Sequence, residues 1–426
     1  MGRLVQKFGG TSVGDANKLR RVAEIVVKEA AAGNQVAVVV SAMGHTTDQL
    51  ISLADSVADE QSTREMDMLL ATGEQVSIAL LTMAIQSLGG RARSFTGAQA
   101  GVITDGIHGS ARIREVRAEA LEKCLKNGEI AVVAGFQGIT EAGDITTLGR
   151  GGSDTTAVAL AAALKAEWCD IYTDVNGVYT ADPRAVQQAR RLEAVSYEEM
   201  LELSAAGAQV LNARAVELAM NTQVPIRLRS TFEPDDEGTL VTHKFLAPEY
   251  TVCGIACDTN HTSFRVKVTR PLQPNPDGSR TPVHYLEAVG RLFQQLHDMG
   301  VTTDNVTLIG KENGAAPELL FTCEKRSARR VQAVIESMHE DLGRPEVVVD
   351  SDLARISVIG SGLSCRRGVV AAIFDTLCNA SIPIRMLTTG DIRVTALVPE
   401  QFRKEAVNHI HEKFCIYPPV DARVFS

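Results

Sequence analysis

The chain has 426 residues, of which 45% are hydrophobic and 22% charged, a balance typical of a globular protein with two to four domains. Lys and Arg number 43 against 52 Asp and Glu, so the net charge is −9, and only 4% of residues are aromatic. This composition argues against nucleic acid or an anionic membrane as the principal partner. The longest apolar run, residues 157–164, is far shorter than the ~18 residues of a membrane helix, and the eight cysteines are scattered. We therefore expect a cytoplasmic protein with reduced thiols and no membrane or nucleic-acid partner.

Residues 1–245 alternate between short apolar runs and helical patterns. Residues 3–8 alternate as a strand, and 36–40 and 130–134 are continuous apolar runs, typical of strands buried on both faces of a parallel sheet. Helices are expected at 16–32, 65–87, 111–126 and 155–166, with Met66, Met68 and Met83 facing the core. This order predicts an α/β domain whose ligands bind beyond the carboxyl ends of the strands.

The composition changes after an acidic turn at 232–238 and a linker-like segment at 246–249. A strand at 264–268 and helices at 286–299 and 328–342 are expected next. From Ala354 the same order recurs: a strand, a glycine loop at 360–362, and helices at 368–380 and up to Phe414. The simplest interpretation is two βαββαβ-like units in tandem, which divides the chain into residues 1–245, 246–350 and 351–426.

Three glycine-rich turns follow expected strands and open expected helices, although no P-loop and no dinucleotide-binding motif is present. They lie at residues 7–12, 134–138 and 148–155. Paired glycines allow close backbone approach, and free N–H groups at a helix start can bind phosphate oxygens. A lysine beside such a turn, here Lys7, can neutralise charge on a transferred phosphoryl group. Any one turn could be merely structural, but three on one sheet favour a phosphoryl-transfer site.

The first of these turns, Lys-Phe-Gly-Gly-Thr-Ser-Val at residues 7–13, resembles the opening motif of the aspartate kinases in the amino acid kinase superfamily. Further matching segments follow in the family's order, at 40–43 with 47–48, 72–74, 99–101 with 104–105, 135–138, 149–154 and 172–184. The two C-terminal units resemble the ACT domains of these enzymes. The resemblance implies a three-layer αβα sandwich with a mostly parallel sheet, followed by two ferredoxin-like ACT domains.

The resemblance also implies an activity. Aspartate kinases transfer the γ-phosphoryl group of MgATP to the side-chain carboxylate of L-aspartate, the first step of aspartate-family amino acid biosynthesis. The Mg²⁺ ion is expected on the ATP phosphates, with no dedicated protein metal site. Feedback inhibition by lysine, threonine or both, and at least a homodimer formed through the ACT domains, are implied as well. Neither the effector nor the size of the oligomer follows from the sequence.

Matching this chain to the family motifs assigns roles to individual residues. Lys7 would stabilise the phosphoryl group in flight and Asp154 would hold that lysine. Arg150 and Glu74 would clamp the amino-acid head group, because a guanidinium grips a carboxylate and a carboxylate suits an ammonium group. Further residues on the substrate side are Ser41, Thr47 and Ser153. The nucleotide would meet Lys7, Gly9, Gly10, Thr173, Asp174, Tyr179, Arg184 and the position of Gln209.

The chain departs from the family pattern in two places. Gln209 stands where the family has a lysine that touches nucleotide phosphates, and Lys7, Arg184 and Mg²⁺ must suffice unless Arg214 compensates. The first ACT-like unit lacks the usual Pro-Gly-x-Ala helix start at residues 281–286. Effector sites are therefore expected mainly in the second unit, at Met386, Thr388 and Asp391.

These departures leave alternatives open. Both ACT-like units could serve only for dimerisation. The chain could be another amino acid or carbamate kinase of the superfamily, or a catalytically silent amino-acid sensor that keeps the fold.

Overall fold

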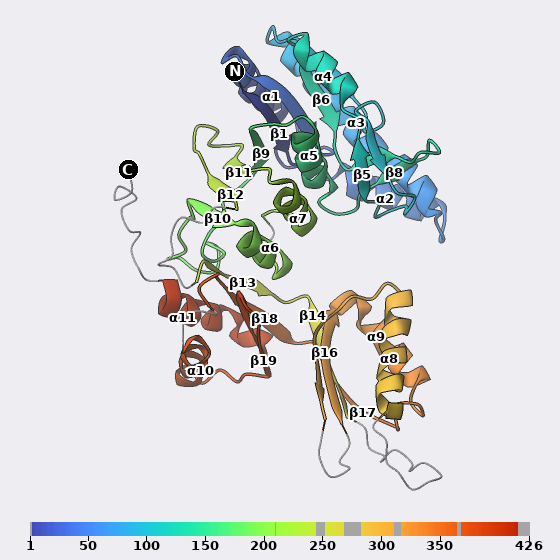
Figure 1. The fold of residues 1–426 in the computed structure, drawn as a ribbon, viewed down its shortest axis with the longest axis vertical. Coiled ribbons are helices and arrows are strands. Elements are labelled where there is room, and N and C mark those ends of the chain that lie inside the picture. The colour runs from blue at the N-terminus through green and yellow to red at the C-terminus, as the bar shows by residue number, and fades with distance from the viewer. Residues whose placement is uncertain are drawn as a thin grey trace. The chain divides into compact units, whose positions relative to one another are not determined.

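The computed structural model describes residues 2–208, 210–243, 252–267, 283–310, 317–363 and 368–415 (Figure 1). The chain divides into two units. The first comprises residues 1–254 with 360–362, and the second comprises 255–359 with 363–426. The predicted boundary between residues 245 and 246 lies outside the described residues.

An eight-stranded sheet forms the centre of the first unit, in the order β10-β12-β11-β9-β1-β2-β6-β3. Its strands are β1 (Arg3–Phe8), β2 (Gln35–Val40), β3 (Ala92–Phe95), β6 (Ile130–Ala134), β9 (Trp168–Thr173), β10 (Ala194–Ser196), β11 (Ile226–Ser230) and β12 (Thr239–Thr242). The pairs from β3 to β11 are all parallel, and β11 pairs with β12 antiparallel. Strands β2 and β6 are buried along nearly their whole length, which is why they appear as continuous apolar runs in the sequence.

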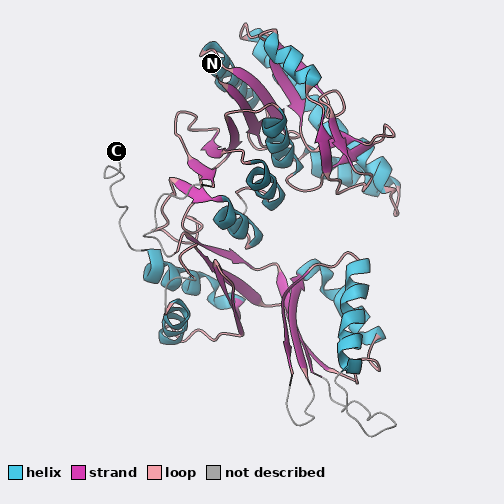
Figure 2. Cartoon of the chain, viewed as in Figure 1, coloured by secondary structure: helices cyan, strands magenta, loops and turns pink. Residues whose placement is uncertain are grey.

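Helices cover both faces of this sheet (Figure 2). On one face, α1 (Ala16–Ala31) and α3 (Thr63–Ser87) pack on Phe8, Val38 and Val40. On the other face, α5 (Gly152–Ala163) packs against β1, β2 and β9, and α7 (Ala213–Thr222) and α6 (Tyr197–Ala205) continue that layer. The predicted three-layer αβα sandwich with a mostly parallel sheet is confirmed.

A second, four-stranded sheet in this unit has the order β5-β4-β7-β8. Its strands are β4 (Val102–Thr104), β5 (Ile113–Val116), β7 (Gln137–Ile139) and β8 (Ile145–Thr147). The predicted helix at 111–126 is wrong over its first half, because β5 pairs antiparallel with β4 and only α4 (Glu119–Lys126) is helical. Pairing with a neighbouring strand overrides the local helical pattern there.

Helix α3 is the one described helix that is long and apolar enough to cross a membrane by length and composition. Two of its charged side chains, Asp67 and Glu74, are nevertheless buried and hydrogen-bonded to other segments of the same unit. The helix also packs against α1, α2 (Thr46–Val57) and β8. Core helices of globular domains can be equally long and apolar.

Two further four-stranded sheets make up the second unit. One has the order β15-β16-β14-β17, with strands β14 (His261–Lys267), β15 (Thr303–Ile309), β16 (Glu318–Glu324) and β17 (Glu346–Asp350) and helices α8 (Val283–Asp298) and α9 (Ala328–Ser337). The other has the order β13-β18-β20-β19, with strands β13 (Gly254–Asp258), β18 (Leu353–Ile359), β19 (Met386–Thr389) and β20 (Arg393–Pro399) and helices α10 (Val369–Asn379) and α11 (Arg403–Cys415).

The boundaries predicted from the sequence place the residues of strand β13 in the wrong ACT-like unit. It precedes the first ACT-like sheet in the chain but pairs with β18 in the second. The first ACT-like unit is therefore inserted between two strands of the second, and the prediction of two strictly tandem units at 246–350 and 351–426 needs this correction. A βαββα run from Leu353 lacks a fourth strand of its own, and β13 supplies it.

Candidate active site

Loops from four neighbouring strands meet at the carboxyl edge of the large sheet. Backbone hydrogen bonds join them: the Gly9 N–H donates to the Tyr172 carbonyl (3.4 Å) and the Ser41 N–H to the Phe8 carbonyl (3.2 Å). The Gly135 N–H likewise donates to the Val40 carbonyl (3.0 Å). These contacts bring together the ends of β1, β2, β6 and β9, where ligands of open α/β sheets bind.

Lys7 and Asp154 form an ion pair at this edge. The Lys7 Nζ lies 2.6 Å from the Asp154 Oδ1, and each side chain is only 12% exposed. Lys7 comes from β1 and Asp154 from the first turn of α5, so strand and helix hold the two charges in place. A Cβ on Gly9 would lie 3.6 Å from the Lys7 Nζ, and one on Gly10 would lie 2.7 Å from the Ala42 carbonyl oxygen. A side chain would fit at Gly9 but not at Gly10, so Gly10 is the glycine that lets the backbone pass close to the loop after β2.

Glu74 is a buried carboxylate on α3, with 3% of its surface exposed. Its Oε1 accepts a hydrogen bond from the Ala42 N–H (3.0 Å), and its Oε2 is buried with no partner among the described residues. Burial raises the pKa of this carboxyl to about 7, against the lowering effect of the Ala42 hydrogen bond. A carboxylate in this position is suited to an ammonium group of a ligand, which would satisfy the orphaned oxygen.

Ser41 and Thr47 flank the Glu74 contact. Ser41 follows β2 directly, Thr47 lies in the first turn of α2, and both are half-buried. The Gly44 N–H between them donates to the Gly10 carbonyl (3.0 Å), so this loop is tied to the turn after Lys7. The structure therefore brings these two predicted substrate residues to the same edge as Lys7.

Arg150 lies on an exposed turn before α5, between two glycines with positive φ, Gly149 (75°) and Gly151 (72°). The backbone of this turn is held from α7: the Leu148 carbonyl accepts from the Arg214 Nη1 (3.2 Å) and the Arg150 carbonyl from the Asn212 Nδ2 (3.1 Å). The side chain of Arg214, which the sequence left open as an alternative phosphate ligand, thus binds the turn that carries Arg150.

Ser153 occupies the second position of α5 and is buried beside Gly135. A Cβ on Gly135 would lie 2.7 Å from the Ser153 Oγ. The glycine after β6 is thus required for Ser153 to reach the edge of the sheet.

Four of the predicted nucleotide residues, Thr173, Asp174, Tyr179 and Arg184, lie at the end of β9 and in the segment that follows it. The Thr173 Oγ1 donates to the Asp174 Oδ1 (3.0 Å), and the Tyr179 hydroxyl donates to the Asn176 Oδ1. The Arg184 side chain is 87% exposed and pairs with Asp182 at 3.0 Å. Gln209 lies outside the described residues.

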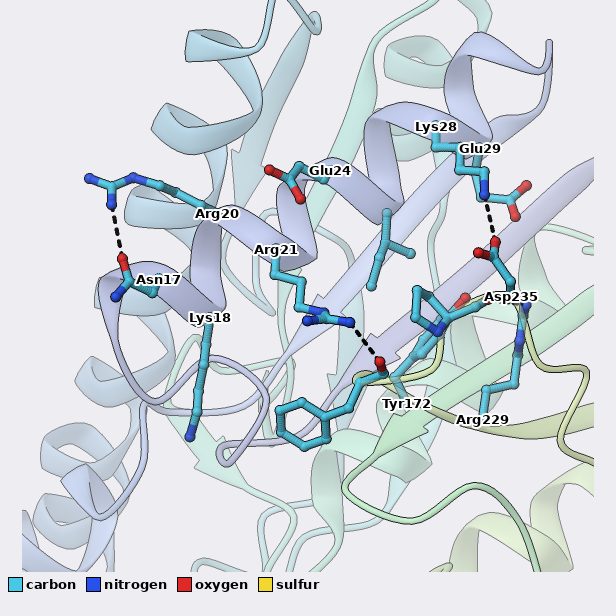
Figure 3. Close-up of a pocket in the computed structure, with 13 residues that line it drawn as sticks. Asn17, Lys18, Arg20, Arg21, Glu24, Lys28, Glu29, Tyr172, Arg229 and Asp235 are labelled. Carbon is cyan, nitrogen blue, oxygen red and sulfur yellow. Dashed lines mark hydrogen bonds and ion pairs between the residues drawn. The ribbon is translucent and has the colours of Figure 1, made fainter.

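A pocket of about 750 Å³ lies elsewhere, between α1 and the loop after β11 (Figure 3). The Arg21 guanidinium donates to the Thr231 and Phe232 carbonyls, and Lys28 pairs with Asp235 at 2.6 Å. Its floor includes Tyr172, whose ring stacks on Phe8 on the α1 face of the sheet. None of the predicted site residues lines this pocket, and these two cations already bind the protein's own loop.

Comparisons with known proteins agree with this architecture. The amino acid kinase family model matches residues 2–230 and an ACT domain model matches residues 356–414. Aspartokinase from Geobacillus stearothermophilus is 44% identical over 97% of each chain, and aspartokinase 2 from Bacillus subtilis is 45% identical over 97% of this chain and 98% of its own. The chain belongs to the aspartokinase family.

Solved aspartokinase structures have the same fold. Aspartokinase III of E. coli, crystallised with aspartate and ADP, superposes with a TM-score of 0.80 at 25% identity, covering 97% of this chain and 99% of its own. The same protein crystallised with lysine and aspartate gives a TM-score of 0.73, covering 96% of this chain and 99% of its own. The predicted family and fold of this aspartokinase-family chain are therefore confirmed.

Proposed function

We propose that this chain transfers the γ-phosphoryl group of ATP to the side-chain carboxylate of L-aspartate, at the edge where Lys7, Asp154 and Glu74 meet. The observation that carries this proposal is the buried Lys7–Asp154 pair at the two-glycine turn after β1. It places a fixed cation where charge develops on a phosphoryl group in transfer. The names of the relatives, and the aspartate and ADP in the E. coli structure, support this choice of reaction.

In the proposed reaction an oxygen of the aspartate side chain attacks the γ-phosphorus while the bond to the bridging oxygen of ADP breaks. The attacking carboxylate is already ionised at neutral pH, so the step needs no general base. Lys7 stabilises the three oxygens of the phosphoryl group in transfer, and Asp154 holds the Lys7 ammonium in place. The Gly10 N–H donates to a phosphate oxygen, while the Gly9 N–H, which donates to the Tyr172 carbonyl, holds the turn against β9.

The acceptor is held by its head group. The Arg150 guanidinium grips the α-carboxylate and the Glu74 carboxylate receives the α-ammonium group, with Ser41, Thr47 and Ser153 beside them. The nucleotide lies toward β9, against Thr173, Asp174, Tyr179 and Arg184. Because Arg214 is bound to the Leu148 carbonyl, we assign the phosphate contacts to Lys7 and Arg184.

Mg²⁺ enters this proposal with the nucleotide. Among the described residues no group of three His, Cys, Asp or Glu side chains is close enough to hold a metal ion. The ion would be carried mainly by ATP phosphates and, when bound, would neutralise charge on the β- and γ-phosphates.

An ADP-release assay with L-aspartate, L-glutamate or no acceptor tests the activity. ADP release that depends on L-aspartate, with an acyl phosphate trapped by hydroxylamine, is the expected result. Release with another acceptor would indicate a different kinase of the superfamily. No release with any acceptor, despite ATP binding by calorimetry, would indicate the amino-acid sensor instead.

Regulation through the second ACT-like sheet is a separate proposal, in which lysine, threonine or both bind near Met386, Thr388 and Asp391. Met386 and Thr388 lie on the edge strand β19, and the Thr388 Oγ1 donates to the Asn305 Oδ1 (3.2 Å) within the same unit. The lysine bound in a related crystal structure supports an amino-acid effector.

Titration of L-lysine and L-threonine, singly and together, tests this regulation by activity and calorimetry. A coupling of ~1–3 kcal/mol would change activity or substrate affinity about five- to 150-fold. If neither amino acid binds at millimolar concentration and Thr388→Ala is silent, the two ACT-like sheets serve only for dimerisation. Light scattering on the purified chain should show at least a homodimer in either case.

A further inference from the structure

Asp67 is a fully buried carboxylate on α3 that the sequence analysis did not single out. It has 0% of its surface exposed, in a helix that is otherwise mostly apolar. Three groups donate to it or pair with it: the Thr147 Oγ1 (2.5 Å), the Gly109 N–H (3.1 Å to each oxygen) and the His108 Nδ1 (2.7 Å). Burying a carboxylate is costly unless it is hydrogen-bonded, so the burial of Asp67 depends on keeping Thr147, Gly109 and His108 in place around it.

The segments held by Asp67 lead directly to Arg150. Thr147 ends β8, and only Leu148 and Gly149 separate it from Arg150. The Thr147 carbonyl accepts from the Ala111 N–H (2.9 Å), which ties the same strand end to the 105–110 turn. A Cβ on Gly149 would lie 3.2 Å from the Gly109 carbonyl oxygen, so the turn fixed by Asp67 packs against the turn that carries Arg150.

Helix α3 also carries Glu74, seven residues after Asp67. Seven residues are about two helical turns, so both side chains point from the same buried face, with a rise of about 10 Å between them. Glu74 contacts the loop after β2 through Ala42, and Asp67 contacts the strand end that precedes Arg150. One rigid helix thus joins the two loops that the proposed function assigns to the two ends of the amino-acid head group.

We propose that Asp67 is a positioning residue for acceptor binding, which acts through Thr147 and Gly109 to set the place of Arg150 relative to Glu74. This inference rests on the proposed function, because it takes Arg150 as the ligand of the α-carboxylate. Asp67 itself touches no substrate atom. Its carboxylate sets where the Arg150 turn begins, and α3 then sets the distance between the two halves of the clamp.

A double-mutant cycle between Asp67→Asn and Arg150→Ala tests this coupling in the full-length enzyme. With Arg150 present, Asp67→Asn should raise KM for the acceptor about 10- to 100-fold and change KM for ATP less than about twofold, because a small displacement of a clamp residue is costly. With Arg150 already replaced by Ala, Asp67→Asn should change kcat/KM less than about threefold. An equal loss in both backgrounds, or an equal rise in KM for ATP, would show that Asp67 only stabilises the fold.

Two further variants keep the test decisive. If Asp67→Asn fails to fold, the same cycle is measured with Thr147→Val, which removes one donor to Asp67. Thr147→Ser keeps the hydroxyl and should restore the acceptor KM. Thr82→Val is the matched control, since Thr82 is a buried hydroxyl on the same helix that has no hydrogen-bond partner among the described residues. It should leave the acceptor KM unchanged, and a rise as large as that of Asp67→Asn would overturn the inference.

The failure of this inference is distinguishable from that of the proposed function. The acceptor is first identified with the wild-type enzyme, and the cycle is measured with that acceptor. If the wild type is active and the losses from Asp67→Asn and Arg150→Ala simply add, the positioning role of Asp67 is excluded and the proposed function stands. A wild type that phosphorylates no amino acid removes the proposed function, and calorimetric titration of L-aspartate into the same variants then decides the role of Asp67 from binding: unequal losses with and without Arg150 support it, and equal losses overturn it.

Discussion

The two halves of the candidate site are built differently. Around the proposed phosphoryl and α-ammonium positions, Lys7, Asp154 and Glu74 are largely buried and each already has a partner in the protein, whereas the other proposed clamp residue, Arg150, is exposed. On the proposed nucleotide side, Asp174 and Arg184 are exposed, and Arg184 pairs with its neighbour Asp182. Groups that act on charge developing in the transition state are most effective when they are fixed beforehand. Exposed groups must leave solvent and their own partners to bind, so they contribute affinity rather than rate.

Replacing Lys7 should give the largest loss of activity among the substitutions at the two halves of the site. Lys7→Ala removes the fixed cation and is expected to lower kcat by ~10²–10⁴ while the fold is retained. Steady-state kinetics and circular dichroism measure the two parts of this prediction. Lys18→Ala, a more exposed lysine on α1 outside the site, is the matched control and should keep normal kcat. A folded Lys7→Ala enzyme with at least a third of normal kcat would remove Lys7 from the catalytic role.

Replacing either residue of the head-group clamp should lower activity somewhat less than Lys7→Ala does. Arg150→Ala and Glu74→Ala each leave one charged group of the substrate unpaired, so each is expected to cost ~2–4 kcal/mol in kcat/KM for L-aspartate. KM for ATP should move little, which separate titration of the two substrates measures. If Glu74→Ala weakened ATP binding alone, the acceptor and nucleotide halves of the site would be reversed.

The pH dependence of acceptor binding sharpens the role of Glu74. Its pKa is raised to about 7 by burial, and only the ionised form attracts an ammonium group. KM for L-aspartate should therefore rise about fivefold between pH 7 and pH 6, and this dependence should disappear in Glu74→Gln. A flat KM profile in the wild type across this range would contradict the assignment.

The same raised pKa predicts that the folded protein loses stability as pH rises, whereas acceptor binding improves. The protonated carboxyl is favoured in the folded state, so its stabilising contribution is complete below the unfolded pKa of about 4.5 and is lost as pH rises through about 7. Glu74→Gln should thus increase the free energy of unfolding on the order of 1–3 kcal/mol above pH 7, relative to its effect at pH 4. Chemical denaturation at the two pH values measures this difference.

The smallest effect is expected on the exposed side. Arg184→Ala should raise KM for ATP about three- to tenfold, because the contact is made in solvent, and should leave kcat and the unfolding midpoint essentially unchanged. Asp182→Ala, which frees the guanidinium, should have no effect or lower KM for ATP slightly. A loss of kcat in Arg184→Ala comparable to that in Lys7→Ala would erase the difference between the two halves.

The sequence alone identified the family, the alternating α/β order and the pairing of Lys7 with Asp154. These features are local or lie in short motifs, because a glycine turn after a buried strand requires particular residues at adjacent positions. Asp67 could have been noticed as a charged residue within the apolar helical stretch at 65–87. Its partners at 108, 109 and 147 could not have been predicted, because no local sequence pattern indicates that these residues contact α3.

Only the tertiary structure decided which surfaces and strands come together. Met68 and Met83, expected in the core, are 42% and 62% exposed, because in α3 the core is lined by another face of the helix. Strand β13 joins the second ACT-like sheet across the whole inserted first unit, and Arg214 binds the Arg150 turn from a different helix. Local patterns record whether a residue is suited to burial, whereas the partner that buries it is set by packing between segments distant in the chain.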